Sequence, residues 1–253
     1  MPRTARQLST TDVYHVFMRG INRQAIFEED DDFRKFMAVV RKCRKASGFE
    51  LYGFCLLDNH AHLLLRAGKE GVSQAVKRIS VSYVSWFNNK HERVGHLFQD
   101  RFGSEPIETD GYLLAALRYI HQNPVKAGLC RLPEHYEWSS YRDYMGEGPG
   151  LADIGFVKGL ASDCSKDWRA WLAEFTVLEC EDGFIDYDDK PPRGDSLLRK
   201  TIKDRFGLEN AGNMSAWERE ARDGAVRLLK EGGFGLRQIS RVTGIPLGIV
   251  RSR

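Results

Sequence analysis

Hydrophobic and polar positions in the first part of the chain follow two different periods. Residues 13–20 (VYHVFMRG) alternate with a period of two and end at a glycine, which predicts a strand. Residues 31–47 place apolar side chains at helical spacing behind an acidic run, which favours a helix N-terminus. Residues 49–67 (FELYGFCLLDNHAHLLLRA) predict two strands joined by a turn at Asp58 and Asn59.

The same reasoning predicts three further elements. Residues 72–91 predict a second amphipathic helix, and residues 95–107 a loop followed by a strand. Residues 110–129 predict a third helix, which Pro124 and Gly128 should stop. The resulting order, β-α-β-β-α-β-α, predicts a mixed sheet covered by helices, an α+β domain.

The remaining residues predict helices and a linker. The glycine-rich residues 146–150 indicate a boundary, and residues 163–175 predict a short helix. The acidic stretch 179–195 is punctuated by glycine and proline and predicts a solvated linker. From residue 214 the chain is basic, with eight Arg and Lys against four Asp and Glu, and predicts a helix, a short helix, a turn at Gly244 and a final helix.

Composition sets limits on the class of protein. The 253 residues are 42% apolar, which is typical of a globular protein, and the net charge of +3 does not by itself indicate a nucleic-acid partner. No apolar stretch is long enough to span a bilayer or to form a signal peptide. The five scattered cysteines lack a CxxC pair, which predicts reduced thiols in a cytoplasmic protein.

The stretch LDNHAHLLLR, residues 57–66, contains the first candidate chemistry. On a strand His60 and His62 point to one face and Ala61 to the other, so the two imidazoles could bind one divalent ion. The alternative is a polar pair at a strand edge, and the HxH pattern alone leaves both open. A closed zinc site needs four N or S ligands, so an oxygen ligand and open positions are the more suitable completion.

The predicted third helix contains a candidate for that oxygen ligand. Tyr119 and Asn123 are four residues apart and share a helix face, and Tyr112 lies seven residues earlier on nearly the same face. A phenol is a poor nucleophile without help, but a metal ion that polarises a phosphoryl oxygen lowers the barrier. The alternative is a tyrosine that only packs beside the sheet, and Tyr112 is the alternative nucleophile.

Five motifs resemble, in order and spacing, the HUH single-tyrosine transposases. Within that family the chain is most similar to the REP-associated tyrosine transposases, over residues 13–144. The motifs are YHVFMRGINRQAIFEEDDDFRKFM, LDNHAHLLL, GHLFQDRFGS, YLLAALRYIHQNPVKAGL and WSSYRDY.

The resemblance implies a mechanism and a fold. His60, His62 and Asn123 would bind Mg²⁺ or Mn²⁺, and Tyr119 would attack single-stranded DNA, leaving a 5′-phosphotyrosine link and a free 3′-OH. The fold implied is a ferredoxin-like antiparallel sheet with helices on one face, followed by a small all-α C-terminal domain. The partners implied are DNA hairpins or repeat elements, bound by a homodimer or a monomer in the cytoplasm, at the nucleoid.

Single-stranded DNA requires cations for its phosphates and flat rings for its bases. The candidates are Arg19, Arg101 and Phe102, together with Arg237 and Arg251 near the C-terminus. The C-terminal helices resemble the helix-turn-helix domains fused to some of these transposases and would bind duplex DNA. The alternative for them is a helical interaction module.

These inferences predict three segments and one leading function. Residues 1–146 would be the catalytic domain, residues 147–213 a helical segment with an acidic linker, and residues 214–253 a helix-turn-helix-like domain. The leading function is metal-dependent cleavage and rejoining of single-stranded DNA. The alternatives are a non-catalytic DNA-binding regulator with the same fold and a nuclease that uses water in place of Tyr119.

Overall fold

The computed structural model describes residues 7–99, 101–178, 184, 195–208, 211–232, 234 and 236–252. Contacts divide the chain into two compact units, Met1–Asp186 and Tyr187–Arg253. Each unit has a core of its own and is described by itself.

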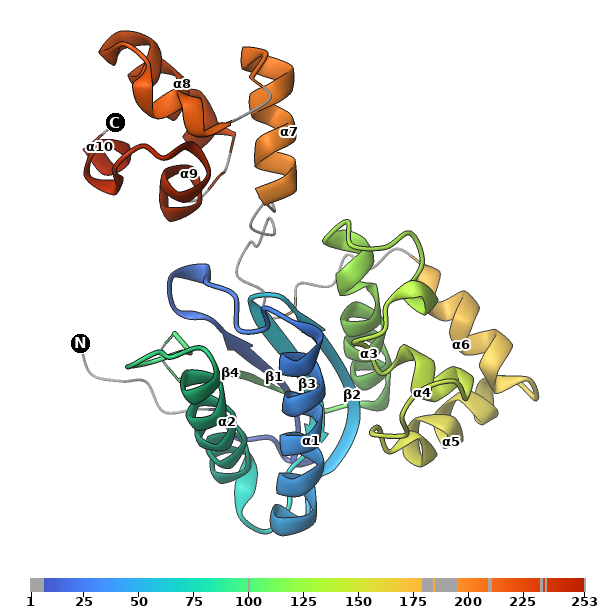
Figure 1. The fold of residues 1–253 in the computed structure, drawn as a ribbon. Helices are drawn as coiled ribbons and strands as arrows, with labels where there is room; N and C mark the ends of the chain where they lie inside the picture. Colours follow the sequence, from blue (N-terminus) through green and yellow to red (C-terminus); the bar gives the residue numbers. More distant parts are fainter. Residues whose placement is uncertain are drawn as a thin grey trace. The chain divides into compact units, whose positions relative to one another are not determined.

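A four-stranded antiparallel sheet lies at the centre of the first unit (Figure 1). Two crossover helices connect its strands, one between β1 and β2 and one between β3 and β4. The ferredoxin-like prediction is confirmed, whereas the mixed sheet expected from periodicity is wrong, because all neighbouring strands run antiparallel. In the order β2-β3-β1-β4 the sheet contains β1 (Val13–Arg19), β2 (Glu50–Leu57), β3 (His60–Arg66) and β4 (Gly103–Pro106), and the crossover helices are α1 (Asp30–Ser47) and α2 (Gly71–Lys90).

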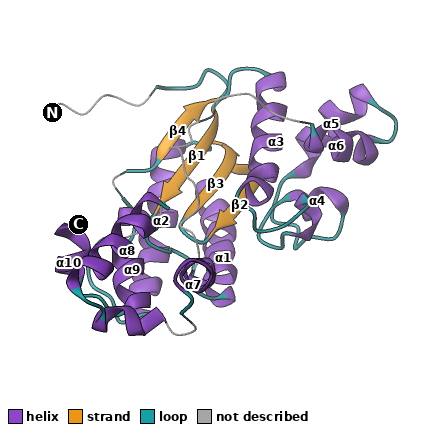
Figure 2. Ribbon diagram, turned by 90° about the horizontal axis from the view of Figure 1, so that it is seen from above, coloured by secondary structure: helices purple, strands orange, loops and turns teal. Residues whose placement is uncertain are grey.

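Helices cover both faces of this sheet (Figures 1 and 2). Leu63 and Leu65 belong to the core formed with α1 and α2, whereas Leu64 belongs to the core formed with α3 (Asp110–Lys126). The prediction that helices lie on one face is therefore wrong. Because the strands are apolar on both faces, each face needs a covering layer.

Two features fix the position and the length of α3. A Cβ atom at Gly53 would lie 2.6 Å from Cδ1 of Leu117, so the glycine lets the helix approach β2 closely without a shift of the Leu117 side chain. The helix also continues past Pro124 to Lys126, so the prediction that Pro124 stops it is wrong. Pro124 has no N–H to donate to the Ile120 carbonyl, yet helical geometry continues for two residues beyond it.

Three more helices complete the first unit. The helix predicted for residues 163–175 begins at Trp168 instead, because the Asp167 side chain accepts a hydrogen bond from the Ala170 N–H and caps it there. Residues 163 and 164 belong to the end of a preceding helix that was not predicted. The second of these helices contacts α3, so residues 146–150 do not end the unit. The helices are α4 (Tyr141–Met145), α5 (Ile154–Cys164) and α6 (Trp168–Val177), with 3-10 turns η1 (Ile21–Arg23) and η2 (Pro133–His135).

The described part of the second unit is all-α. Gly244 has a φ of +71° and turns the chain between the last two helices, as predicted. The first helix of this unit packs on η3 and α9, so the unit begins before the predicted boundary at residue 214. The predicted linker 179–195 lies outside the described residues apart from Phe184 and Asp195. The elements are α7 (Asp195–Phe206), η3 (Ala211–Ala216), α8 (Arg219–Glu231), α9 (Leu236–Thr243) and α10 (Leu247–Ser252).

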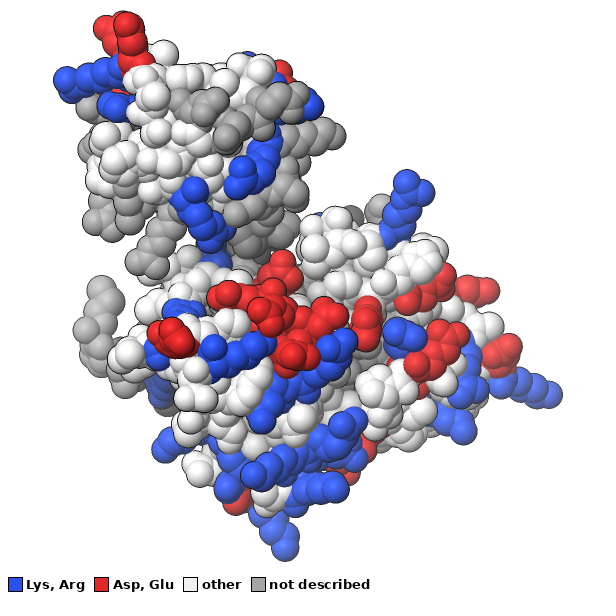
Figure 3. Space-filling view, viewed as in Figure 1, with Lys and Arg blue, Asp and Glu red and all other residues white. Residues whose placement is uncertain are grey.

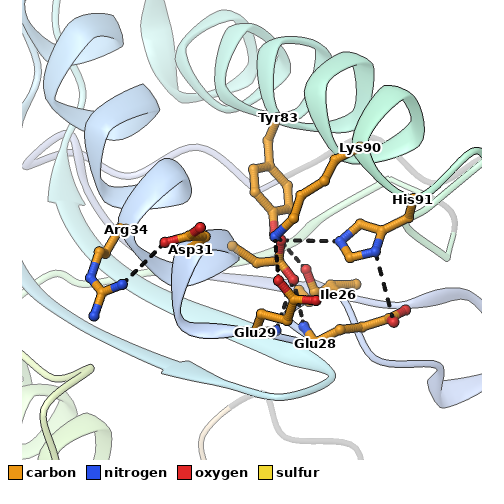
Figure 4. A network of polar contacts seen from close by, with 9 residues as sticks. Ile26, Glu28, Glu29, Asp31, Arg34, Tyr83, Lys90 and His91 are labelled. Carbon is orange, nitrogen blue, oxygen red and sulfur yellow. Dashed lines mark hydrogen bonds and ion pairs between the residues drawn. The ribbon is translucent and has the colours of Figure 1, made fainter.

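Lys90 and His91 at the end of α2 lie beside Glu28 and Glu29 before α1 (Figure 4), and Asp32 ties these two places together. Its carboxylate is fully buried and accepts hydrogen bonds from the Glu28 and Glu29 N–H groups at 2.7 and 3.0 Å. Lys90 Nζ lies 2.8 Å from the other carboxylate oxygen, and His91 Nε2 lies 3.1 Å from it. One buried charge is therefore held by four donors from two elements.

The loop before α1 holds the turn that precedes His60. The Tyr83 hydroxyl donates to the Ile26 carbonyl at 2.5 Å (Figure 4). The Ile26 N–H donates to the Asp58 carbonyl at 2.7 Å. The predicted turn at Asp58 and Asn59 is confirmed. Hydrogen bonds thus connect α2, through the loop before α1, to the turn that precedes β3.

Charged side chains separate along α1 (Figure 3). Residues 28–31 at its start are acidic and exposed, and the basic residues 41, 42 and 45 near its end are also exposed. This arrangement matches the helix dipole. Among the described residues, no helix is long and apolar enough to cross a membrane.

Candidate active site

The predicted orientation of the two histidines of β3 is confirmed. The His62 ring lies against the Tyr119 ring of α3, with centroids 5.7 Å apart and planes at 84°. Ala61 lies in the core on the opposite face, with α1 and α2. The β3 histidines and the α3 tyrosine therefore meet on one side of the sheet.

Strands β1 and β4 add three polar residues to this face. In the strand register Arg19 pairs with His60, and His15 pairs with Glu105. The Nε2 atom of His15 lies 2.9 Å from Nδ1 of His62. His15 and Arg19 are both buried, so the histidines are enclosed by polar groups rather than by solvent.

The two β3 histidines each leave one nitrogen without a hydrogen bond. Nδ1 of His60 lies 2.6 Å from Oδ1 of Asn59, and Nδ1 of His62 is bonded to His15. The Nε2 atoms of both rings are buried and have no hydrogen-bond partner within the described chain. Buried polar atoms are nearly always paired, so two orphaned atoms on neighbouring rings indicate a missing ligand.

Burial keeps both rings uncharged. Burial, followed by the Arg19 charge, lowers the pKa of His60 to about 3. Burial, followed by the neighbouring rings of His60 and His15, holds the pKa of His62 well below its usual range. At neutral pH the rings are neutral imidazoles, the form that binds metal ions.

Tyr119 and Asn123 lie together on α3, as their spacing predicts. Tyr119 is 5% exposed, and Lys126 Nζ lies 5.1 Å from the centre of its ring. Nδ2 of Asn123 donates to the Tyr119 carbonyl at 3.2 Å. The side-chain oxygen of Asn123 is therefore the atom left for a metal ion, since an amide nitrogen is not a ligand.

Tyr112 has a different environment from Tyr119. Its hydroxyl donates a hydrogen bond to Glu105, and its ring stacks on Phe184 at 5.2 Å. Phe184 also packs on the Tyr119 ring at 4.9 Å, so one aromatic residue contacts both tyrosines. The ring contact with His62 belongs to Tyr119, which favours Tyr119 as the nucleophile.

The residues present fit a divalent metal ion. No group of three or more His, Cys, Asp and Glu side chains suited to a metal occurs within the described ranges, so a third ligand from those ranges would be of another type. Two neutral imidazoles together with the Asn123 amide oxygen would make such a set and would leave positions for water or phosphate oxygens.

Comparison with known proteins identifies the first part of the chain. Residues 9–123, which include β1–β4, both histidines, Tyr119 and Asn123, match the family model described as "Transposase IS200 like". This region is a transposase IS200-like domain. A curated protein of Haemophilus influenzae, named as a REP-associated tyrosine transposase, is 26% identical over 132 residues, covering 46% of this chain and 73% of that protein.

Two solved structures are similar to this chain. One is a REP-associated tyrosine transposase bound to a REP hairpin, with a TM-score of 0.49 and 19% identity over 61% of this chain and 90% of that one. The other is a protein of Deinococcus radiodurans named as a transposase, with a TM-score of 0.35 and 16% identity over 48% of this chain and 97% of that one.

The residues predicted to contact DNA differ in their exposure to solvent. In the transposase IS200-like domain Arg101 is exposed, while the half-buried Phe102 packs against the core under α1 and α2. Arg19 is buried beside His60 rather than on an open surface. The side chains of Arg237 and Arg251 lie outside the described part of the second unit.

Sequence reasoning missed three residues of this site. Glu105 and Phe184 were not considered, and His15 on the first predicted strand could approach the site but, as a lone histidine, is more often structural. The structure places all three against the candidate residues. Alternation along residues 13–19 predicts the face of His15 but not the identity of the neighbouring strand. His121 is fully buried, and its Nε2 atom lies at hydrogen-bond distance from Ser140 Oγ, 2.9 Å.

Proposed function

We propose that this protein cleaves and rejoins single-stranded DNA at hairpin or repeat sequences through a covalent link to Tyr119. The observation that carries the proposal is the contact between Tyr119 and His62 beside two orphaned imidazole nitrogens, within a transposase IS200-like domain. A tyrosine that only packed on the sheet would need no such neighbours.

The proposed step exchanges one ester for another. The Tyr119 oxygen attacks the phosphorus, the bond from phosphorus to the 3′ oxygen breaks, and a 5′-phosphotyrosine and a free 3′-OH result. The phenol loses one proton and the departing 3′ oxygen gains one, so protons balance. Attack by another 3′-OH reverses the step, and no external energy source is required.

The other residues hold and orient the reacting groups. His60, His62 and Asn123 would bind Mg²⁺ or Mn²⁺, which, when bound, polarises a phosphoryl oxygen. Arg19, buried beside His60, supplies a positive charge that suits a DNA phosphate. Packing by α3 fixes Tyr119 on the same side of the sheet, which reduces the entropy cost of attack.

The experiment uses a pool of single-stranded hairpin oligonucleotides with randomised flanks, incubated with the full chain and Mn²⁺. A 5′-phosphotyrosine keeps a 3′-end label on the protein in a denaturing gel and releases a 5′-end label on a shorter fragment. Cleavage with neither label on the protein would indicate attack by water. Binding without cleavage would indicate a DNA-binding regulator.

The metal site gives a prediction that needs no DNA. We expect His60→Ala and His62→Ala each to weaken Mn²⁺ binding by about 100-fold or more, because each removes one ligand from a site with few protein ligands. Electron paramagnetic resonance of free Mn²⁺ measures the affinity. His135→Ala is the control: this histidine is exposed and lies 3.5 Å from Glu134, so its removal should leave Mn²⁺ binding unchanged.

The second unit would bind duplex DNA. Helices α9 and α10 contact each other across the turn at Gly244, and Ile239, Ile245 and Val250 lie in their shared core. This arrangement supports, as part of the same proposal, a helix-turn-helix-like module. A fragment beginning at residue 187 should then bind duplex DNA with an affinity that falls as salt rises.

A further inference from the structure

A line of polar groups runs across three strands behind His62. His15 Nε2 lies 2.9 Å from His62 Nδ1, and Glu105 Oε2 lies 3.9 Å from His15 Nδ1. The side chain of Glu105 is 20% exposed, whereas that of His15 is fully buried, and the Tyr112 hydroxyl donates to Glu105. The line therefore leads from Tyr112 on α3 to Glu105 on β4, then to His15 on β1 and His62 on β3.

Only one placement of protons leaves His62 able to bind a metal ion through Nε2. A neutral imidazole carries one N–H, so one of the two facing nitrogens of His15 and His62 donates and the other accepts. If His62 donates from Nδ1, its Nε2 has a free lone pair. If His15 donates instead, the His62 proton is on Nε2 and blocks that atom.

The carboxylate of Glu105 decides between the two placements. It lies beside Nδ1 of His15, where a negative charge favours an N–H. With its proton on Nδ1, His15 presents the lone pair of Nε2 to His62 and can only accept. His62 must then donate from Nδ1, which frees Nε2.

We propose that Glu105 and His15 are positioning residues that fix His62 in the tautomer whose Nε2 atom binds the metal ion. The inference rests on the metal site of the proposed function. His60 gains the same tautomer from a different acceptor, Oδ1 of Asn59 at 2.6 Å. Metal-binding histidines commonly donate their second N–H to an acceptor of this kind, and loss of that acceptor weakens metal binding.

The proposal also gives Tyr112 a role. Its hydroxyl donates to Glu105, which holds the carboxylate in place and requires that it remain an acceptor. Tyr112 thus supports the histidines from behind, whereas Tyr119 contacts the His62 ring from α3. Of the two tyrosines on this helix face, Tyr112 is thus the positioning residue and Tyr119 the proposed nucleophile.

The test reads the tautomer directly in protein without metal or DNA. Nitrogen NMR of ¹⁵N-histidine-labelled protein distinguishes a protonated Nδ1 from a protonated Nε2. In the wild type we expect His62 to be protonated on Nδ1. In Glu105→Gln we expect a mixture of tautomers or a protonated Nε2, and Mn²⁺ binding weakened by about 10-fold or more. Glu108→Gln is the matched control, because Glu108 is an exposed carboxylate that binds Thr10, and it should change neither reading.

The possible failures are distinguishable. A wild-type His62 protonated on Nε2, or an unchanged tautomer and Mn²⁺ affinity in Glu105→Gln, would overturn the role of Glu105 while leaving the proposed chemistry of Tyr119 intact. Absence of Mn²⁺ binding by the wild type would overturn the metal site itself, and this inference with it. His15→Phe, which keeps a ring without the acceptor nitrogen, should weaken Mn²⁺ binding as Glu105→Gln does, and normal binding in it would also contradict the proposal.

Discussion

Replacement of Tyr119 by phenylalanine is expected to abolish the covalent protein–DNA adduct and to reduce strand cleavage by about 10³-fold or more. The phenylalanine ring keeps the contacts with His62 and Phe184 that hold the side chain in place, and only the attacking oxygen is lost. Retention of a 3′-end label on the protein in a denaturing gel measures the adduct.

Tyr112→Phe separates the two candidate nucleophiles. This change removes the hydrogen bond to Glu105 but leaves the Tyr119 oxygen in place, so the adduct should form in reduced amount rather than disappear. An adduct that survives in Tyr119→Phe and vanishes in Tyr112→Phe would make Tyr112 the nucleophile. Unchanged cleavage without any adduct in Tyr119→Phe would instead indicate water as the nucleophile.

Asp32→Asn is expected to destabilise the first unit by about 2–4 kcal/mol, measured by urea unfolding. The carboxylate is fully buried, and the amide that replaces it would face the Lys90 ammonium and backbone N–H groups with one acceptor fewer. Asp31→Asn is the matched control. The exposed Asp31 pairs only weakly with Arg34 at 3.1 Å, so its loss should cost less than about 1 kcal/mol.

The Asp32 network also predicts how stability depends on pH. Burial raises the pKa of Asp32, but hydrogen bonds from Lys90, His91 and two backbone N–H groups outweigh it, so the pKa lies below its usual value of 3.8. A carboxyl whose pKa is lower in the folded state stabilises the fold above its unfolded pKa. This contribution should be lost as the pH falls below about 4, and the loss should be absent in Asp32→Asn.

Local sequence patterns predicted the parts of the site that lie on single elements. Alternation along β3 places His60 and His62 on one face, and the four-residue spacing on α3 places Tyr119 and Asn123 on one face. Each of these relations depends on one strand or helix alone. The same is true of the turn at Asp58 and Asn59.

The relations that sequence patterns missed depend on contacts between elements distant in the chain. His15 and His62 are 47 residues apart, and their hydrogen bond exists only because β1 pairs with β3. The second helical layer was missed because strands that are apolar on both faces do not reveal which helix covers which face. Phe184 was missed because the acidic residues around it are typical of a linker.

The most direct measurement is the mass of the peptide that carries the covalent DNA. After reaction with a hairpin oligonucleotide, nuclease trimming and trypsin digestion, Tyr119 lies on the peptide of residues 119–126, whereas Tyr112 lies on the peptide of residues 102–118. We predict a nucleotide phosphate on the peptide 119–126, attached to its single tyrosine. A nucleotide on the peptide 102–118, or cleaved DNA with no modified peptide, would contradict the assignment of Tyr119 as the nucleophile.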